Sequence, residues 1–193
     1  MQVAQLVPRE LAPFVHPQVE DFCAVHSSNN AFCAPEGSPL FSVSEFEEAR
    51  RRVEEEDPEH GEHGSEEKGN YTMSVLLNVL EKRGCNAECF PTPAPQPAAT
   101  SPTPWSSLLQ GPGAILRPRH SRHWVALARL PGELGSDFLL IDSVGQRAFK
   151  IDSDDKLEAI LAQCAVGIHL LRWPDPTVLP PPAPEREGGK GRR

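Results

Sequence analysis

The segment HWVALARLPGELGSDFLLIDSV, residues 123–144, contains two apolar runs separated by a turn-forming stretch. Residues 123–130 and 138–144 are rich in the β-branched, aromatic and other apolar residues that favour strands. The PGELGSD between them supplies the Pro, Gly, Ser and Asp typical of turns. The segment therefore predicts an antiparallel hairpin. AVGIHLLRW at 165–173 predicts a third strand, after a helical SDDKLEAILAQC at 153–164.

The predicted hairpin brings together two side chains with complementary chemistry. His123 lies at the start of the first run and Asp142 near the end of the second, with their midpoint inside the turn. Near cross-strand neighbours on one face have Cβ atoms about 5 Å apart. A carboxylate in that place orients the imidazole. The two side chains together are two of the three members of a catalytic triad.

A thiol in the N-terminal half can supply the third member. QVEDFCAVHSSNN at 18–30 predicts a helix over 18–33 with Asp21 as its N-cap and Cys23 in its first turn. The segment fits a buried structural helix, a metal half-site or the nucleophile end of a cysteine hydrolase. A helix N-terminus favours the thiolate. Gln18, just ahead of the helix, can donate to an oxyanion together with the Cys23 backbone N–H.

Two further helices and two irregular stretches follow. FSVSEFEEARRRVEEE at 41–56 contains the capping-box pair Ser42 and Glu45, and TMSVLLNVLEKRG at 72–84 ends at Gly84. Residues 54–69 are acidic and contain glycine, so we expect a mobile surface loop with solvated histidines at 60 and 63. The Pro-rich residues 91–104 predict a second loop, because proline removes hydrogen-bond donors.

Composition narrows the class of protein. The 193 residues carry 27 acidic and 19 basic side chains, a net charge of −8, which argues against a nucleic-acid partner. No apolar run has the length of a transmembrane segment. Five cysteines without a compact framework fit a reducing compartment, so we expect an intracellular protein of the cytoplasm or nucleus. Cys85 and Cys89 lack a second pair at zinc-finger spacing, and we expect no metal or cofactor.

Four motifs together resemble the Josephin family. They are Q-x-x-x-x-C-A-V-H-x-x-N-N from Gln18, GNY at 69–71, RHWVAL at 122–127 and IDS at 141–143. The chain is most similar to the short proteins that consist of a Josephin domain alone. The resemblance implies a papain-like α+β fold with an N-terminal helical part and a small antiparallel sheet. It also implies a deubiquitinating cysteine protease, with ubiquitin or ubiquitinated proteins as partners. We expect a monomer.

The same resemblance assigns roles to the site residues. Cys23 would be the nucleophile, His123 the general base and then acid, Asp142 its orienting partner, and Gln18 the oxyanion donor. Some family members carry asparagine where Asp142 stands. The predicted organisation is an arm at 1–17, a catalytic domain at 18–176, which includes the acidic and Pro-rich loops, and a disordered tail at 177–193. The acidic loop is hypothesised to be a lid that attracts the basic face of ubiquitin.

Other interpretations remain open at this level. Cys23 alone is more often a buried small residue than a nucleophile. His26, one helical turn away, could compete as the base, although the resemblance makes it a neighbour of the site. Asn29 and Asn30 are expected to tie the helix to surrounding loops, and Tyr71 and Trp124 to pack. The rival functions are an inactive ubiquitin-binding module and a papain-like amidase acting on small molecules or peptides.

Overall fold

The computed structural model describes residues 22–32, 39–58, 63, 70–91, 111–119, 121–129, 138–144 and 147–170. The arm at 1–17, Gln18, most of the acidic loop, the Pro-rich loop beyond Pro91 and the tail at 177–193 lie outside the described residues. The helices are α1 Cys23–Ala31, α2 Val43–Glu56, α3 Met73–Lys82 and α5 Asp154–Leu161. The strands are β1 Ala87–Pro91, β2 Gly113–Pro118, β3 Val125–Arg129, β4 Phe138–Asp142, β5 Arg147–Ile151 and β6 Cys164–Leu170. The fold is α+β.

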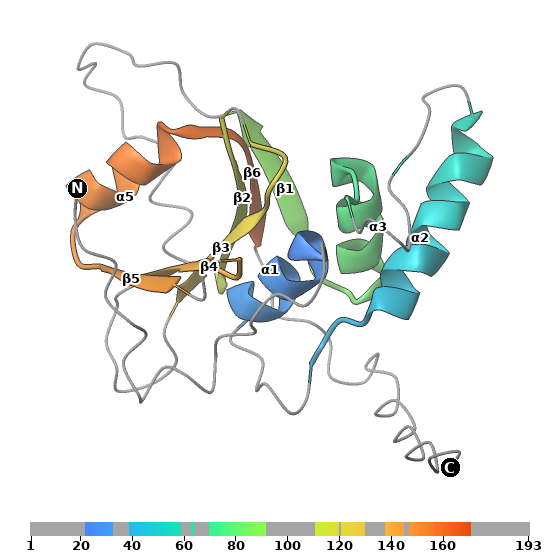
Figure 1. The fold of residues 1–193 in the computed structure, drawn as a ribbon, viewed down its shortest axis with the longest axis horizontal. Coiled ribbons are helices and arrows are strands. Elements are labelled where there is room, and N and C mark those ends of the chain that lie inside the picture. The colour runs from blue at the N-terminus through green and yellow to red at the C-terminus, as the bar shows by residue number, and fades with distance from the viewer. Residues whose placement is uncertain are drawn as a thin grey trace, which may run out of the picture.

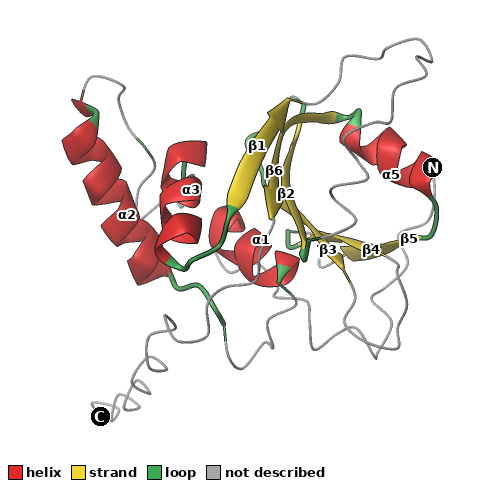
Figure 2. Ribbon diagram, turned by 180° about the vertical axis from the view of Figure 1, so that it is seen from behind, coloured by secondary structure: helices red, strands yellow, loops and turns green. Residues whose placement is uncertain are grey.

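The strands form one antiparallel sheet in the order β1-β6-β2-β3-β4-β5 (Figure 2). The predicted hairpin is present, with Ala126 opposite Ile141 and Arg129 opposite Phe138. The sheet is larger than the three strands that the sequence predicts. β2, which was not predicted, lies between β3 and β6 and pairs with both. β1 and β5 form the two edges.

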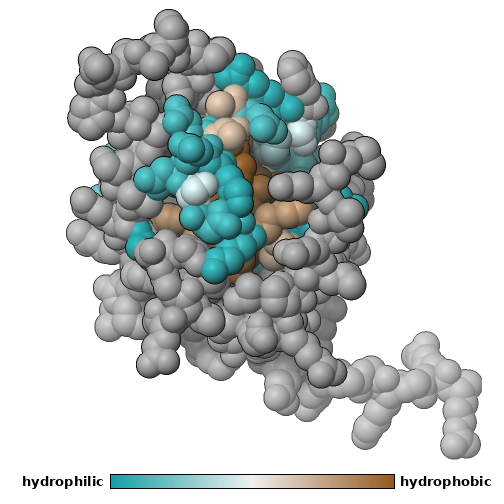
Figure 3. Space-filling model, turned by 90° about the vertical axis from the view of Figure 1, so that its left-hand side faces the viewer, coloured by the Kyte–Doolittle hydropathy of each residue, from teal (hydrophilic) through white to brown (hydrophobic). Residues whose placement is uncertain are grey.

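Both faces of the sheet are covered by helices. α1, α2 and α3 lie on one side and α5 on the other (Figure 1). Side chains alternate accordingly: Ala126 and Ala128 of β3 pack with α1–α3, whereas Val125 and Leu127 pack with α5. A view onto the α5 side shows hydrophilic residues lying over apolar ones (Figure 3). This double burial explains why the inner strands β2, β3 and β4 are mostly apolar.

The helix ends agree with the sequence prediction at two places and differ at a third. At the start of α2, the Glu45 carboxylate accepts hydrogen bonds from the Ser42 N–H and Oγ, at 2.9 and 3.0 Å. At the end of α3, Gly84 has φ 69°, and the N–H groups of Gly84 and Cys85 bond to the carbonyls of Glu81 and Leu80. The predicted start of α1 was wrong, because the helix begins at Cys23 rather than at residue 18, and Phe22 rather than Asp21 is the N-cap, with no capping side chain.

Two predictions for the acidic stretch also require correction. Glu54–Glu56 belong to the last turn of α2, where Glu54 forms an ion pair with Arg50. His63 is buried rather than solvated, with 6% of its surface exposed. Its Nδ1 lies 3.2 Å from Thr72 Oγ1, and its carbonyl accepts a bond from the Thr72 N–H. The acidic pattern of residues 54–69 does not reveal that His63 contacts Thr72, just before α3.

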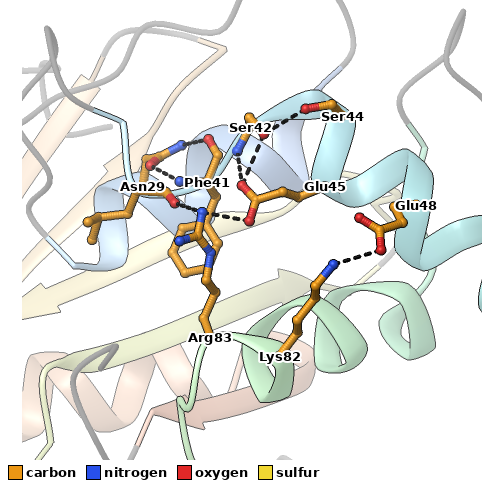
Figure 4. A network of polar contacts seen from close by, with 9 residues as sticks. Asn29, Phe41, Ser42, Ser44, Glu45, Glu48, Lys82 and Arg83 are labelled. Atoms are coloured by element: carbon orange, nitrogen blue, oxygen red, sulfur yellow. Dashed lines mark hydrogen bonds and ion pairs between the residues drawn. The ribbon is translucent and has the colours of Figure 1, made fainter. Parts of the chain in front are cut away.

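A buried polar network joins the three helices on one side of the sheet (Figure 4). The Asn29 amide donates to the Phe41 carbonyl at 2.9 Å and accepts from the Phe41 N–H at 3.0 Å. Arg83 pairs with Glu45 and donates to the Leu40 carbonyl. The predicted role of Asn29 in tying its helix to a neighbouring loop is confirmed. α1, which begins with Cys23, is therefore fixed to the start of α2.

Candidate active site

The His123 and Asp142 side chains are in direct contact. His123 Nε2 lies 2.9 Å from Asp142 Oδ1. Because an ionised carboxylate only accepts hydrogen bonds, Nε2 carries the proton and Nδ1 is the nitrogen left for another partner. Asp142 Oδ1 also accepts the Val144 N–H at 3.1 Å, a turn that fixes the carboxylate.

The two residues meet by a different geometry from the predicted one. Asp142 is the last residue of β4, but His123 precedes β3 in the segment 121–124. The hairpin register ends at the pair Ala126 and Ile141; if it is extended by one residue, Asp142 comes opposite Val125, so His123 reaches Asp142 diagonally from two residues away. The prediction that both residues lie on the strands is thus wrong for His123.

Cys23 lies beside His123 and Asp142, although it comes from the N-terminal part of the sequence. It is the first residue of α1 and so lies in the first turn of the helix, where the sequence predicts it, and only 3% of its surface is exposed. It shares a cavity of about 440 Å³ with His123 and Asp142, whose remaining lining residues are Asn70, Ser121, Arg122 and Val144. His26, the alternative base, is not among the described residues that line this cavity.

The surroundings of His123 determine its charge. Burial alone lowers the pKa of His123, but hydrogen bonds and electrostatic interactions with Asp142 and Cys23 raise it to about 9. The imidazole is therefore protonated at neutral pH. An imidazolium beside a thiol and a carboxylate is an arrangement suited to nucleophilic attack followed by proton donation to a leaving group.

The segment that holds His123 is braced by contacts that sequence reasoning missed. The His123 N–H donates to Ser121 Oγ at 2.9 Å, and Arg117 Nε donates to the Ser121 carbonyl at 3.2 Å. The buried Trp124 ring donates from Nε1 to the Tyr71 carbonyl at 3.3 Å, as expected of a packed aromatic. The only available signal was the proximity of Ser121 and Trp124 to His123 in SRHW.

Other candidate side chains from the sequence, within the described part of the chain, do not line this cavity. The Tyr71 hydroxyl donates to Glu47 Oε1 at 2.7 Å, which confirms a core role. Burial raises the pKa of the Cys85 thiol to about 12 and that of Cys164 to about 11.

No group of His, Cys, Asp and Glu within the described ranges could hold a metal ion. Each helix in the described part of the chain is too short or too polar to cross a bilayer.

Comparison with known proteins shows a distant similarity. No protein-family model matches the sequence. A Drosophila melanogaster protein named Josephin-like protein is 27% identical over 121 residues, which cover 60% of this chain and 53% of that protein. The chain thus spans about half the length of this relative. The similarity suggests the Josephin family and supports no finer assignment.

Proposed function

We propose that the protein is a deubiquitinating cysteine protease of the Josephin family, with a papain-like fold. It hydrolyses the peptide or isopeptide bond after the C-terminal Gly-Gly of ubiquitin. The observation that carries the proposal is the convergence of Cys23, His123 and Asp142 on one cavity, with Cys23 at a helix start. The distant Josephin-like relative supports the choice of family.

The proposed chemistry begins with the formation of a thioester at Cys23. The Cys23 thiolate attacks the carbonyl carbon of the terminal glycine, and the resulting oxyanion accepts hydrogen bonds from Gln18 and the Cys23 N–H. The C–N bond then breaks as the His123 imidazolium gives its proton to the leaving amine. This leaves a thioester and a neutral imidazole.

Hydrolysis of the thioester restores the enzyme. His123 takes a proton from a water molecule, whose oxygen attacks the thioester carbonyl. The C–S bond breaks, the thiolate and imidazolium are regenerated, and ubiquitin leaves with a free carboxyl group, which releases its proton to solvent. Throughout the cycle Asp142 holds the ring in one orientation and stabilises its positive charge, through the 2.9 Å hydrogen bond.

Hydrolysis of a fluorogenic amide at the ubiquitin C-terminus tests the proposal against its rivals. We expect turnover of the ubiquitin substrate and a much lower kcat/KM for a short peptide amide ending in Gly-Gly, because the body of ubiquitin contributes binding energy. Equal activity on the short peptide would indicate a small-substrate amidase. Ubiquitin binding without turnover would indicate a binding module.

A further inference from the structure

Ser27 makes a hydrogen bond that is unusual for a serine inside a helix. Such a serine commonly bonds back to the carbonyl four residues earlier. Ser28 does so, since its Oγ donates to the Ala24 carbonyl at 2.8 Å. Ser27 Oγ instead donates across to the carbonyl of Trp124, also at 2.8 Å. Both serines are fully buried.

The two ends of this bond each lie beside a member of the candidate site. Ser27 follows Cys23 by four residues on α1, so the two side chains share a face of the helix. Trp124 directly follows His123 in the segment before β3. α1 packs against β3 and β4 (Figure 1), but the sheet register does not include residues 121–124.

Trp124 also links a third part of the site. Its ring Nε1 donates to the carbonyl of Tyr71, the neighbour of Asn70, which lines the cavity. Its own carbonyl accepts the Ser27 hydroxyl. Trp124 thus connects the helix of Cys23, the segment of His123 and the segment of Asn70 through two buried hydrogen bonds.

From these contacts we infer that Ser27 is a positioning residue, which sets the distance between the Cys23 thiol and the His123 imidazole by holding the Trp124 carbonyl against α1. The inference rests on the proposed function. Ser27 is buried and does not line the cavity, so it acts through His123 and does not touch the substrate. Its loss affects the chemical step and not substrate binding.

The physical reason is that the chemistry of Cys23 and His123 depends on the distance between the thiol and the imidazole. Misplacement of a catalytic group by about 1 Å can lower a rate by about a hundredfold. Without the hydroxyl, the Trp124 carbonyl loses its partner on α1, and the segment 121–124 is free to move away from the helix. His123 then loses contact with Cys23, which is one of the two groups that keep the ring protonated.

Ser27→Ala and Ser28→Ala form a matched pair for the test. Each variant removes one buried hydroxyl from the same helix, and only Ser27 reaches the His123 segment. The pKa of His123 is measured by NMR titration of its ring. The reactivity of Cys23 is measured as its rate of alkylation by iodoacetamide at pH 7, followed by mass spectrometry of the peptide that contains Cys23.

We expect Ser27→Ala to lower the pKa of His123 by about one pH unit and to slow Cys23 alkylation about tenfold. Ser28→Ala should retain the wild-type value of both. On a ubiquitin amide, Ser27→Ala should lower kcat with KM unchanged. The inference is overturned if Ser27→Ala leaves the pKa and the alkylation rate unchanged, or if both variants alter them equally.

Two features keep the test decisive. Titration and alkylation require no ubiquitin, so they judge Ser27 even if the wild-type protein fails to hydrolyse ubiquitin and the proposed function is wrong. If Ser27→Ala does not fold, Ser27→Cys places a weaker donor at the same position. A lower pKa of His123 in Ser27→Cys supports the inference, and a wild-type pKa contradicts it.

Discussion

Removal of the Asp142 carboxylate is the perturbation whose effect can be worked out most fully from the structure. In Asp142→Ala, His123 Nε2 loses its partner at 2.9 Å. A hydrogen bond to a charged group contributes about 1.5–3 kcal/mol, and each 1.4 kcal/mol corresponds to about tenfold in rate. If this bond stabilises the transition state, kcat/KM should fall by roughly 10- to 150-fold.

The same change should alter the pH profile. The pKa of His123 is raised from 6.5 to about 9 in part by Asp142, so activity should decline above about pH 9 as the imidazolium loses its proton. An opposite charge nearby commonly accounts for about 1–3 pH units. We therefore expect the alkaline limb of Asp142→Ala to move down by about one to two pH units, toward 6.5.

The assay is the pH dependence of kcat/KM on a fluorogenic ubiquitin amide, with NMR titration of His123 as an independent readout. Asp142→Asn separates geometry from charge, because it keeps an oxygen that can accept the bond but removes the negative charge. It should lose less activity at pH 7 than Asp142→Ala while showing a lowered alkaline limb. Asp152→Ala is the control, since it removes an exposed carboxylate that is paired with Lys156.

A folded Asp142→Ala protein with the wild-type alkaline limb and an unchanged His123 titration would refute the reasoning. Asp142 would then be a neighbour of His123 that neither orients the ring nor stabilises its charge. An equal shift in Asp152→Ala would also refute it, because the effect would then come from general surface charge.

Three further predictions concern stability. Because folding raises the pKa of His123 from 6.5 to about 9, its contribution is complete below pH 6.5 and is lost as pH rises through 9. Denaturant unfolding should show this decline, at most about 3 kcal/mol, in wild type and not in His123→Ala. Gly113→Ala should destabilise by about 2 kcal/mol or more, because its Cβ would lie 2.0 Å from the Leu127 carbonyl oxygen; an unchanged melting temperature would contradict this. Asn29→Ala should cost about 2–4 kcal/mol in urea unfolding, because it leaves both backbone groups of Phe41 unpaired, and a loss under about 0.5 kcal/mol would contradict that account.

The sequence predicts those parts of the fold where local signals agree with tertiary packing. The hairpin of β3 and β4 follows from two apolar runs around a Gly- and Pro-containing turn, and the end of α3 follows from Gly84. β2 was missed although it is central, because GAILRP is short and flanked by Gly and Pro, which are turn signals. Its strand character comes from pairing with β3 and β6, which are distant in sequence.

The candidate site was predictable in its residues and less so in its geometry. The hairpin places Asp142 near His123, and the Josephin resemblance adds Cys23. The diagonal approach of His123 depends on where β3 begins, which the apolar pattern does not fix. The Ser27 contact could not be foreseen, because a helical serine usually bonds within its own helix. Gln18 remains a prediction, since it lies outside the described residues.

The most direct test of the central claim is covalent labelling by ubiquitin that carries a thiol-reactive group at its C-terminus. Wild-type protein, Cys23→Ala, His123→Ala and His26→Ala are compared by the mass of the adduct. The account predicts an adduct with wild type and with His26→Ala, a strongly reduced one with His123→Ala, and none with Cys23→Ala. An adduct that persists in Cys23→Ala, or none with the wild-type protein, would contradict it.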